Sequence, residues 1–449
     1  MLQGSITRGL LTIALPIMVM NVTQSLFNLV GMTVLKSFAG DGYAVGAVGA
    51  CTSPISLITG LLVGCSSGAN VVIARHIGAK NRESAERAVG AAMLFSLLGG
   101  LFLSAIGITC AELFLTWMNC PAALFSNAVL YFRLYFAGIP LSMIYNFSAS
   151  ILRSTGDSRR PMIYLTVAGA LKVVFTVLFV AVFRLSVVGV ALATILSWSV
   201  SCFLGLRALF TSRSEYIRLL PARLRLYRRE LSDVLSIGIP AGLQQALYSI
   251  ANVIIMASVN SFGPAATTGV SIANNFDGIL YNIATAPALA VMPYVSQNLG
   301  ANDPRRAKRA VTIGMTITVA MAATLGALSA IFSGELSSIM STDPEVIRFS
   351  QQKMIIISST YFICGINEIL AAAMRGLRRP IVPTVSALLY MCVFRFLWVL
   401  FIFPLCPNLT FLYLVWPVSW ALCILTTLCF YLPTIRGNWR KRFPSALSE

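Results

Sequence analysis

The sequence predicts an all-α integral membrane protein, with twelve transmembrane helices in two similar six-helix lobes around a central cavity. Of the 449 residues, 57% are hydrophobic and only 11% are charged, whereas soluble domains carry about 25% charged residues. The hydrophobic residues form long runs, and a helix that spans a bilayer needs roughly 20 of them. Motifs of the first half also return about 222 residues later. These three observations exclude an ordinary soluble globular protein.

Twelve apolar segments, separated by Gly, Pro, Asn and charged residues, are the predicted membrane helices. They cover approximately residues 8–37, 44–74, 87–117, 122–152, 161–183, 187–211, 230–261, 266–298, 307–333, 344–374, 381–404 and 409–434. Several are longer than a bilayer requires, which predicts tilting or extension beyond the lipid. The first apolar run is too long for a signal peptide and lacks a small-residue cleavage site, so it is expected to be the first membrane helix.

The positions of Lys and Arg predict the orientation of the chain. With the N-terminus in the cytoplasm, most of the 33 Lys and Arg residues fall in cytoplasmic loops and in the C-terminal tail, as the positive-inside rule requires. The outer loops are then short and neutral or acidic. We therefore expect a multi-pass protein of the cytoplasmic membrane with both termini inside, and we read the net charge of +18 as a topology signal rather than a nucleic-acid site.

Two motifs carry the internal repeat. An L-x-I-x-x-P frame ending at Pro16 returns with its proline at Pro240, and the loop pair Gly78-Ala79 returns as Gly300-Ala301. The second match lies in a polar loop, where chance similarity is less common than in leucine-rich helices. Because each half holds an even number of helices, the two lobes should be related by an axis along the membrane normal.

The repeat also predicts the domain boundaries. The N-terminal lobe is expected at residues 1–210, a basic cytoplasmic linker at 211–229, and the C-terminal lobe with a basic tail at 230–449. Two similar lobes around a cavity suit alternating access.

These motifs resemble those of the multidrug and toxic compound extrusion (MATE) family across nearly the whole chain. The most specific match is Leu152-Arg-Ser-Thr-Gly-Asp-Ser-Arg-Arg-Pro161-Met162, which is similar to the family's L-R-G-x-G-D-x-x-x-P-M. The resemblance implies an antiporter that exports organic, often cationic, compounds in exchange for H+ or Na+. One position departs from the family: Gly31 stands where prokaryotic members commonly have an Asp, so the coupling ion stays unassigned.

No enzyme activity is expected. The sequence contains no G-x-x-x-x-G-K-[ST] motif for ATP, and its single His, His76, belongs to no His-Asp-Ser set. We expect no cofactor and no metal, with H+ or Na+ as the coupling ion. The expected partners are a small organic substrate and membrane lipid, and the chain is expected to be a monomer.

Two carboxylates of the C-terminal half are the candidate sites for cation or proton coupling. Asp277 lies about 16 Å into its predicted helix, and Asn274 and Tyr281 share its face by i, i+3, i+7 spacing. Glu368 lies about 10 Å from the cytoplasmic edge, at the position equivalent to Asn146 in the first half. An ionised group within the membrane needs a partner, a wet cavity or a function. Protonating either carboxylate would remove a charge that faces a cationic substrate, so proton and substrate would compete.

A structural role is the alternative for each carboxylate: a hydrogen-bond network for Asp277 and a pairing with a nearby Lys or Arg for Glu368. Lys172 and Arg395 are candidate counter-ions of these carboxylates, or they contact an anionic or zwitterionic substrate. Lys353, like Arg133, is expected near the outer boundary, where a long side chain can reach the interface.

Neutral polar residues form the candidate substrate cavity, although each could equally join helices by hydrogen bonds. They are Gln24, Asn28, Asn146, Gln245, Asn252, Asn274 and Tyr281.

An alternative function is a lipid-linked saccharide flippase, or another anionic-lipid flippase, of the same broad superfamily. The sign of the charge that lines the cavity distinguishes the two functions. A cavity dominated by carboxylates favours export of cations, whereas one dominated by Lys172 and Arg395 favours an anionic lipid.

Overall fold

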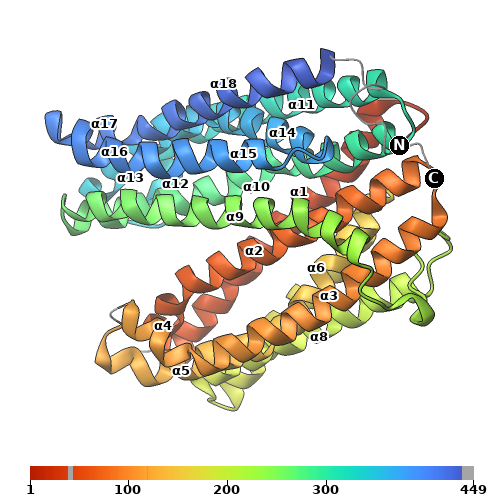
Figure 1. The fold of residues 1–449 in the computed structure, drawn as a ribbon. Coiled ribbons are helices and arrows are strands. Elements are labelled where there is room, and N and C mark those ends of the chain that lie inside the picture. Colours follow the sequence, from red (N-terminus) through yellow and green to blue (C-terminus); the bar gives the residue numbers. More distant parts are fainter. Residues whose placement is uncertain (39–43, 119, 437–449) are drawn as a thin grey trace. The chain divides into compact units, whose positions relative to one another are not determined.

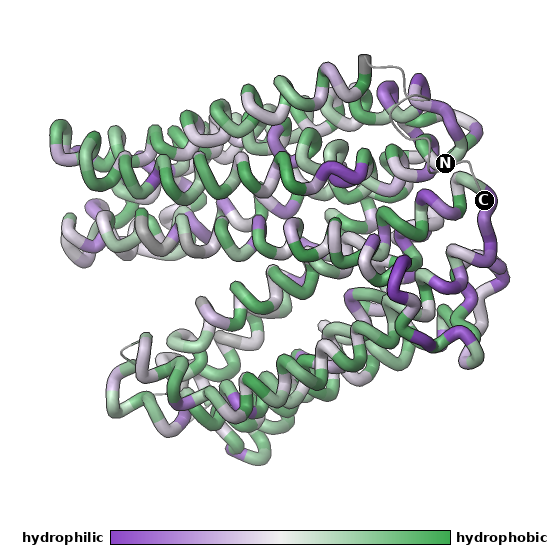
Figure 2. Tube along the Cα trace, in the orientation of Figure 1, coloured by the Kyte–Doolittle hydropathy of each residue, from purple (hydrophilic) through white to green (hydrophobic). Residues whose placement is uncertain are grey.

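The computed structural model describes residues 1–38, 44–118 and 120–436. Within these ranges the regular secondary structure is entirely helical, and each of the twelve predicted segments contains at least one helix. In the described part of the chain, nine helices are long and apolar enough to cross a membrane, and two bent helix pairs raise the number to eleven. The expected all-α membrane fold is thus confirmed. Figure 2 shows hydrophobic residues along most of the helices and hydrophilic residues concentrated near their ends.

The chain forms two compact units, and both boundaries between them fall inside a helix. The N-terminal unit contains Val19–Gly242, and the C-terminal unit contains Met1–Met18 together with Leu243–Glu449. The first helix, α1 (Ile6–Phe38), and the ninth, α9 (Arg228–Asn260), therefore each contribute to both units.

Long helices build most of the N-terminal unit (Figure 1). After the second part of α1 come α2 (Ala44–Gly78), α3 (Arg82–Thr109), α4 (Ala111–Trp117), α5 (Ala122–Ala137), α6 (Ile139–Ser154), α7 (Arg159–Thr176) with a π-helical turn (Val177–Val182), α8 (Ser186–Phe210), a 3-10 turn (Pro221–Arg223) and the first part of α9. The fourth predicted segment is bent by 44° between α5 and α6. Pro140 lies in the first turn of α6, where its missing N–H and its ring interrupt a continuous helix.

The C-terminal unit is also built from helices. Its helices are the first part of α1, the second part of α9, α10 (Pro264–Gly300), α11 (Pro304–Ile331), α12 (Ser333–Ser338), α13 (Pro344–Ser359), α14 (Tyr361–Gly376), α15 (Ile381–Ala387), α16 (Phe394–Leu397), α17 (Leu409–Tyr413) and α18 (Val415–Arg436). Two π-helical turns (Leu388–Val393 and Trp398–Ile402) and a 3-10 turn (Phe403–Leu405) flank α16. Helix α10 packs against α11, α13 and α14. The tenth predicted segment is bent by 46° between α13 and α14.

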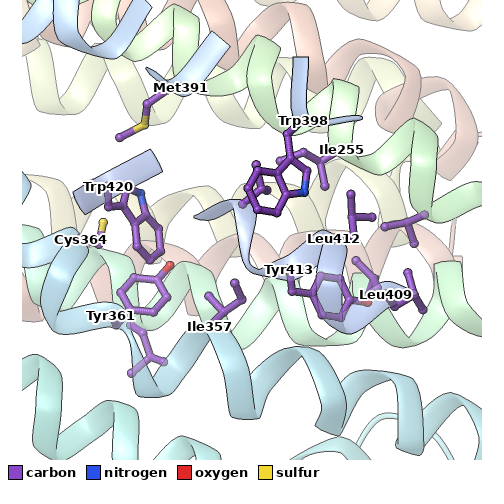
Figure 3. Close-up of a cluster of buried hydrophobic side chains, with 14 of the residues drawn as sticks. Ile255, Ile357, Tyr361, Cys364, Met391, Trp398, Leu409, Leu412, Tyr413 and Trp420 are labelled. Carbon is purple, nitrogen blue, oxygen red and sulfur yellow. The ribbon is translucent and has the colours of Figure 1, made fainter. Parts of the chain in front are cut away.

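Aromatic and aliphatic side chains together form the core of the C-terminal unit (Figure 3). Tyr361 and Trp420 lie 5.7 Å apart between ring centroids, and the buried Trp398 packs 5.3 Å from Phe411. These side chains come from α14, α18, the second π-helical turn and α17. The cluster fixes the mutual positions of the helices that carry the candidate carboxylates.

A close glycine contact joins α2 to the first part of α9 within the N-terminal unit. Gly64 and Gly68 on α2 meet Gly238 and Gly242 on α9, and each pair has the four-residue spacing of a G-x-x-x-G motif. A Cβ atom at Gly238 would lie only 2.5 Å from the backbone oxygen of Cys65. Small residues allow membrane helices to approach closely in this way, so the contact holds the start of α9 against α2.

Candidate functional site

A buried ion pair is the first component of the candidate site in the C-terminal unit. Lys353 on α13 places its Nζ 2.8 Å from Oδ2 of Asp277 on α10, and it also donates a hydrogen bond to Oδ1 of Asn274. The Lys353 side chain is 2% exposed, so the expectation that it reaches the outer boundary was wrong. Because α13 packs on α10 and the carboxylate compensates the ammonium charge, Lys353 can stay buried.

The second carboxylate oxygen of Asp277 differs from the first. Oδ1 is buried and has no hydrogen-bond partner among the described residues. The hydroxyl of Tyr361 donates to the backbone oxygen of Asp277 over 3.1 Å and so fixes this turn of α10. Asn274, one turn earlier, is exposed, which leaves one edge of the ion pair open.

A hydrogen-bond network surrounds the second candidate carboxylate. Glu368 on α14 is buried, and its Oε1 accepts a hydrogen bond of 3.0 Å from the hydroxyl of Tyr248 on α9. That hydroxyl in turn accepts from Nε2 of Gln244 at 2.9 Å and from Nδ2 of Asn367 at 3.4 Å. Arg375 joins the network by donating to Gln244 Oε1 over 3.2 Å. Glu368 therefore accepts a hydrogen bond from a neutral phenol, and the guanidinium of Arg375 lies two hydrogen bonds beyond that phenol, through Gln244.

Two candidate cavity residues lie close to this network. The side chain of Tyr281 on α10 interacts with that of Gln245 on α9, and Tyr281 also packs against the hydrophobic core. The structure thus brings Gln245 and Tyr281 together, while Asn274 lies with the ion pair of Lys353.

Arg395 on α16 is held by neutral groups. Its Nε and Nη2 donate to Oγ of Ser419 over 3.1 and 3.0 Å, and its Nη1 donates to Oδ1 of Asn252 over 3.4 Å. Its guanidinium carbon lies 5.6 Å from the ring centroid of Trp416, and Nζ of Lys353 lies 5.7 Å from the same centroid. Asp277 pairs with Lys353, while the described hydrogen bonds of Arg395 reach a serine, an asparagine and the sulfur of Met391.

The remaining candidates belong to the N-terminal unit. Gln24 is exposed on α1, Asn146 on α6 donates to the backbone oxygen of Ser142 over 2.8 Å, and Lys172 lies on α7. The side chain of Asn28 lies outside the described residues. These four candidates are therefore in a different unit from Asp277 and Glu368.

Sequence reasoning missed Tyr248 and Trp416. An aromatic residue in an apolar helix is by default a packing residue, so neither stands out. Tyr248 follows Gln244 by four residues and therefore shares its helix face, which was the available signal. Nothing in the sequence places Trp416 beside two cations, because that contact depends on the packing of α13 and α16 against α18.

The buried carboxylates of the site are groups that can bind a proton or a cation. Among the described residues, no group of three or more His, Cys, Asp and Glu side chains could hold a metal ion. Glu368 is a buried carboxylate within hydrogen-bond reach of a neutral donor, and such a group can bind a proton or a small cation. The charge of Asp277 is already compensated by Lys353.

Comparison with known proteins gives consistent matches along the chain. The MatE family model matches residues 16–178 and 240–400. A Bacillus subtilis protein named "Probable multidrug resistance protein YoeA" is 27% identical over 393 residues, which are 86% of this chain and 84% of that protein. A Shewanella oneidensis protein named "FAD transporter" is 26% identical over 80% of this chain and 82% of its own length.

The fold also matches a solved structure described as the outward-facing conformation of a multidrug resistance MATE family transporter of the MOP superfamily. The TM-score is 0.90, the sequences are 19% identical, and the alignment covers 97% of each chain. The similarity supports the membrane-transporter fold over its full length.

Proposed function

The chain belongs to the MatE family of multi-pass membrane transporters, and on this premise we propose that it exports small organic cations in exchange for H+ or Na+. The family is one of multidrug efflux transporters and not of enzymes. We place the protein in the cytoplasmic membrane as a monomer with both termini inside. The proposed lobes are residues 1–210 and 230–449, joined by the basic linker 211–229, and the proposed mechanism is alternating access.

Glu368 carries the proposal. Its carboxylate is buried in the C-terminal unit, and its described hydrogen-bond partner is the neutral hydroxyl of Tyr248. A proton or Na+ that binds Glu368 removes the charge that would attract a cationic substrate, so the two ligands compete for one site. Competition of this kind makes each ligand shift the transporter between states with different affinities, which is the basis of exchange.

Asp277 is the second candidate carboxylate for cation or proton coupling, and because it is paired with Lys353 we propose Glu368 as the site of exchange. The proposed substrate contacts are the neutral polar residues Gln24, Asn28, Asn146, Gln245, Asn252, Asn274 and Tyr281. Several of them already accept or donate hydrogen bonds within their own unit, so contact with substrate requires exchange of these bonds for bonds to the ligand.

The test is dye flux through purified protein in liposomes. Liposomes loaded with ethidium are placed under an imposed pH gradient and then under an imposed Na+ gradient, and dye movement is followed by fluorescence. The Glu368→Gln and Asp277→Asn variants are compared with wild type, and Glu335→Gln, an exposed carboxylate of the same unit, is the matched control.

Wild type and the control variant are expected to move dye under one gradient, which names the ion, and Glu368→Gln is expected not to. Movement that persists in Glu368→Gln would contradict coupling at this carboxylate. No movement in wild type under either gradient would contradict cation export altogether.

A second candidate cargo is an anionic aromatic compound. The described hydrogen bonds of the buried Arg395 go to neutral groups, so its positive charge remains available to an anion. One relative is named as an FAD transporter. Flux of FAD through the same liposomes, lost in Arg395→Gln, would favour this cargo, and Lys172 would be the next residue to change.

A further inference from the structure

We propose that Lys353 is a built-in cation: its ammonium group occupies an alkylammonium-binding site formed by Asp277, Asn274 and Trp416 and keeps Na+ and small organic cations away from Asp277. The site is made of three kinds of group. Nζ of Lys353 contacts a carboxylate oxygen of Asp277 at 2.8 Å, the amide oxygen of Asn274, and an indole ring whose centroid is 5.7 Å away. Carboxylates, amide oxygens and aromatic faces are the groups that bind organic ammonium ions in proteins.

The placement of Lys353 shows that this site favours a cation strongly. Asp277 and Asn274 lie on α10, Trp416 lies on α18, and the ammonium is brought to them from α13. Burying an ammonium group is strongly unfavourable unless partners replace its water. Lys353 is nonetheless 2% exposed, so the three partners must compensate most of this cost.

One of the groups that hold the ammonium is exposed. Asn274 is exposed, so the ammonium is not enclosed on every side by apolar residues. Asp277 Oδ1 is buried without a hydrogen-bond partner among the described residues. An acceptor in this state has unused capacity for an N–H donor. A free alkylammonium ion carries the same three N–H donors as lysine, and without a tether it can turn them toward both carboxylate oxygens.

A second positive charge strengthens the exclusion of cations. The guanidinium of Arg395 lies 5.6 Å from the same Trp416 ring. With Lys353 and Arg395 both beside this indole, an additional cation at Asp277 would face two like charges in a medium of low dielectric constant. Asp277 therefore does not serve as an exchangeable cation site while Lys353 is in place.

The inference deepens the proposed function, on which its consequence for transport rests. Of the two buried carboxylates, Asp277 holds a permanent cation, whereas Glu368 is held by a phenol hydroxyl. Exchange of H+ or Na+ against substrate is thereby assigned to Glu368, and Lys353 becomes the residue that determines how many exchangeable cation sites this unit has.

The test measures ligand binding and not flux. Ethylammonium, which matches the end of a lysine side chain, is titrated into purified full-length protein in detergent micelles and followed by calorimetry and by thermal unfolding; Na+ is the second probe. Lys353→Ala is expected to bind ethylammonium at least about tenfold more tightly than wild type. There are two matched controls. Lys353→Arg keeps a tethered cation, and the double variant Lys353→Ala with Asp277→Asn removes the carboxylate. Both should bind ethylammonium no more tightly than wild type does.

Loss of Lys353 leaves a buried carboxylate without its counter-ion, so Lys353→Ala is also purified with ethylammonium present throughout. The added ion should restore folding and raise the thermal unfolding temperature of this variant alone. Absence of both binding and rescue would overturn the proposal, as would equal binding by the double variant. Because this binding experiment needs no transport, its outcome is independent of the dye-flux experiment. A negative result would overturn the role of Lys353 and leave the proposed cation efflux through Glu368 unaffected.

Discussion

The glycine contact between α2 and α9 predicts that a single added methyl group destabilises the protein. In Gly238→Ala the added Cβ would lie 2.5 Å from the backbone oxygen, 2.9 Å from Cα and 3.0 Å from the carbonyl carbon of Cys65. Carbon atoms prefer separations of about 3.5–4.0 Å. All three neighbouring atoms belong to the backbone, so no side-chain rotation can relieve the overlap, and the two helices must move apart.

The cost follows from these distances. Forcing a methyl group into a well-packed contact destabilises a protein by about 1–3 kcal/mol, and separating the helices also loses contacts along both glycine pairs. Alanine itself favours a helix over glycine by about 0.5–1 kcal/mol, which offsets part of that loss. We therefore expect Gly238→Ala to lower stability, with the net effect toward the smaller end of that range if the helices adapt.

Thermal unfolding in detergent, followed by light scattering and by tryptophan fluorescence, measures the effect. Gly49→Ala is the matched control: it lies on α2 of the same unit, and a Cβ there meets nothing within 4 Å, so stability should be unchanged or slightly higher. Equal unfolding temperatures for Gly238→Ala and Gly49→Ala would refute the argument that backbone contact holds α9 to α2.

Three further predictions concern the candidate site. Lys353→Met should destabilise the protein by about 3–5 kcal/mol, because it leaves a buried charge unpaired, and adding Asp277→Asn should recover most of that lost stability. Thermal unfolding of both single variants and of the double variant measures the coupling energy between the two side chains. Additive losses of stability would contradict a direct ion pair. Tyr248→Phe removes the described hydrogen bond to Glu368, so ethidium efflux should slow in liposomes while the protein stays folded; unchanged efflux would mean that the hydroxyl does not position the carboxylate. Arg395→Lys should lower the stability of the protein by about 1–3 kcal/mol, because a single ammonium group cannot reproduce the hydrogen bonds that the guanidinium makes to a serine and an asparagine. Thermal unfolding measures this loss. An unfolding temperature equal to that of wild type would contradict a stabilising role for these hydrogen bonds.

Much of the fold follows from hydropathy. Runs of apolar residues mark each of the twelve segments, and Pro140 gives a local reason for the bend between α5 and α6. The bend between α13 and α14 at Thr360 has no proline, so the sequence carried no comparable signal for it. The division of α1 and α9 between two units is likewise invisible to hydropathy, although the G-x-x-x-G spacing at Gly238 and Gly242 indicates a close helix contact.

The sequence was enough to predict which residues belong to the candidate site, but not which side chains they contact. Buried carboxylates in apolar helices stand out by their cost, which identifies Asp277 and Glu368. Their partners depend on which helix faces which, and that is set by tertiary packing. Lys353 illustrates the point, because a long basic side chain reaches water from many positions, and only the contact of α13 with α10 shows that this one is buried beside a carboxylate.

Competition at Glu368 is the central claim, and equilibrium binding tests it most directly. The affinity of purified protein for ethidium is measured by fluorescence across a series of pH values and, separately, of Na+ concentrations, for wild type, Glu368→Gln and the control Glu335→Gln. Affinity in wild type and in the control should fall as H+ or Na+ rises, and this dependence should vanish in Glu368→Gln. A dependence of equal size in Glu368→Gln, or binding in wild type that ignores both ions, would contradict the claim.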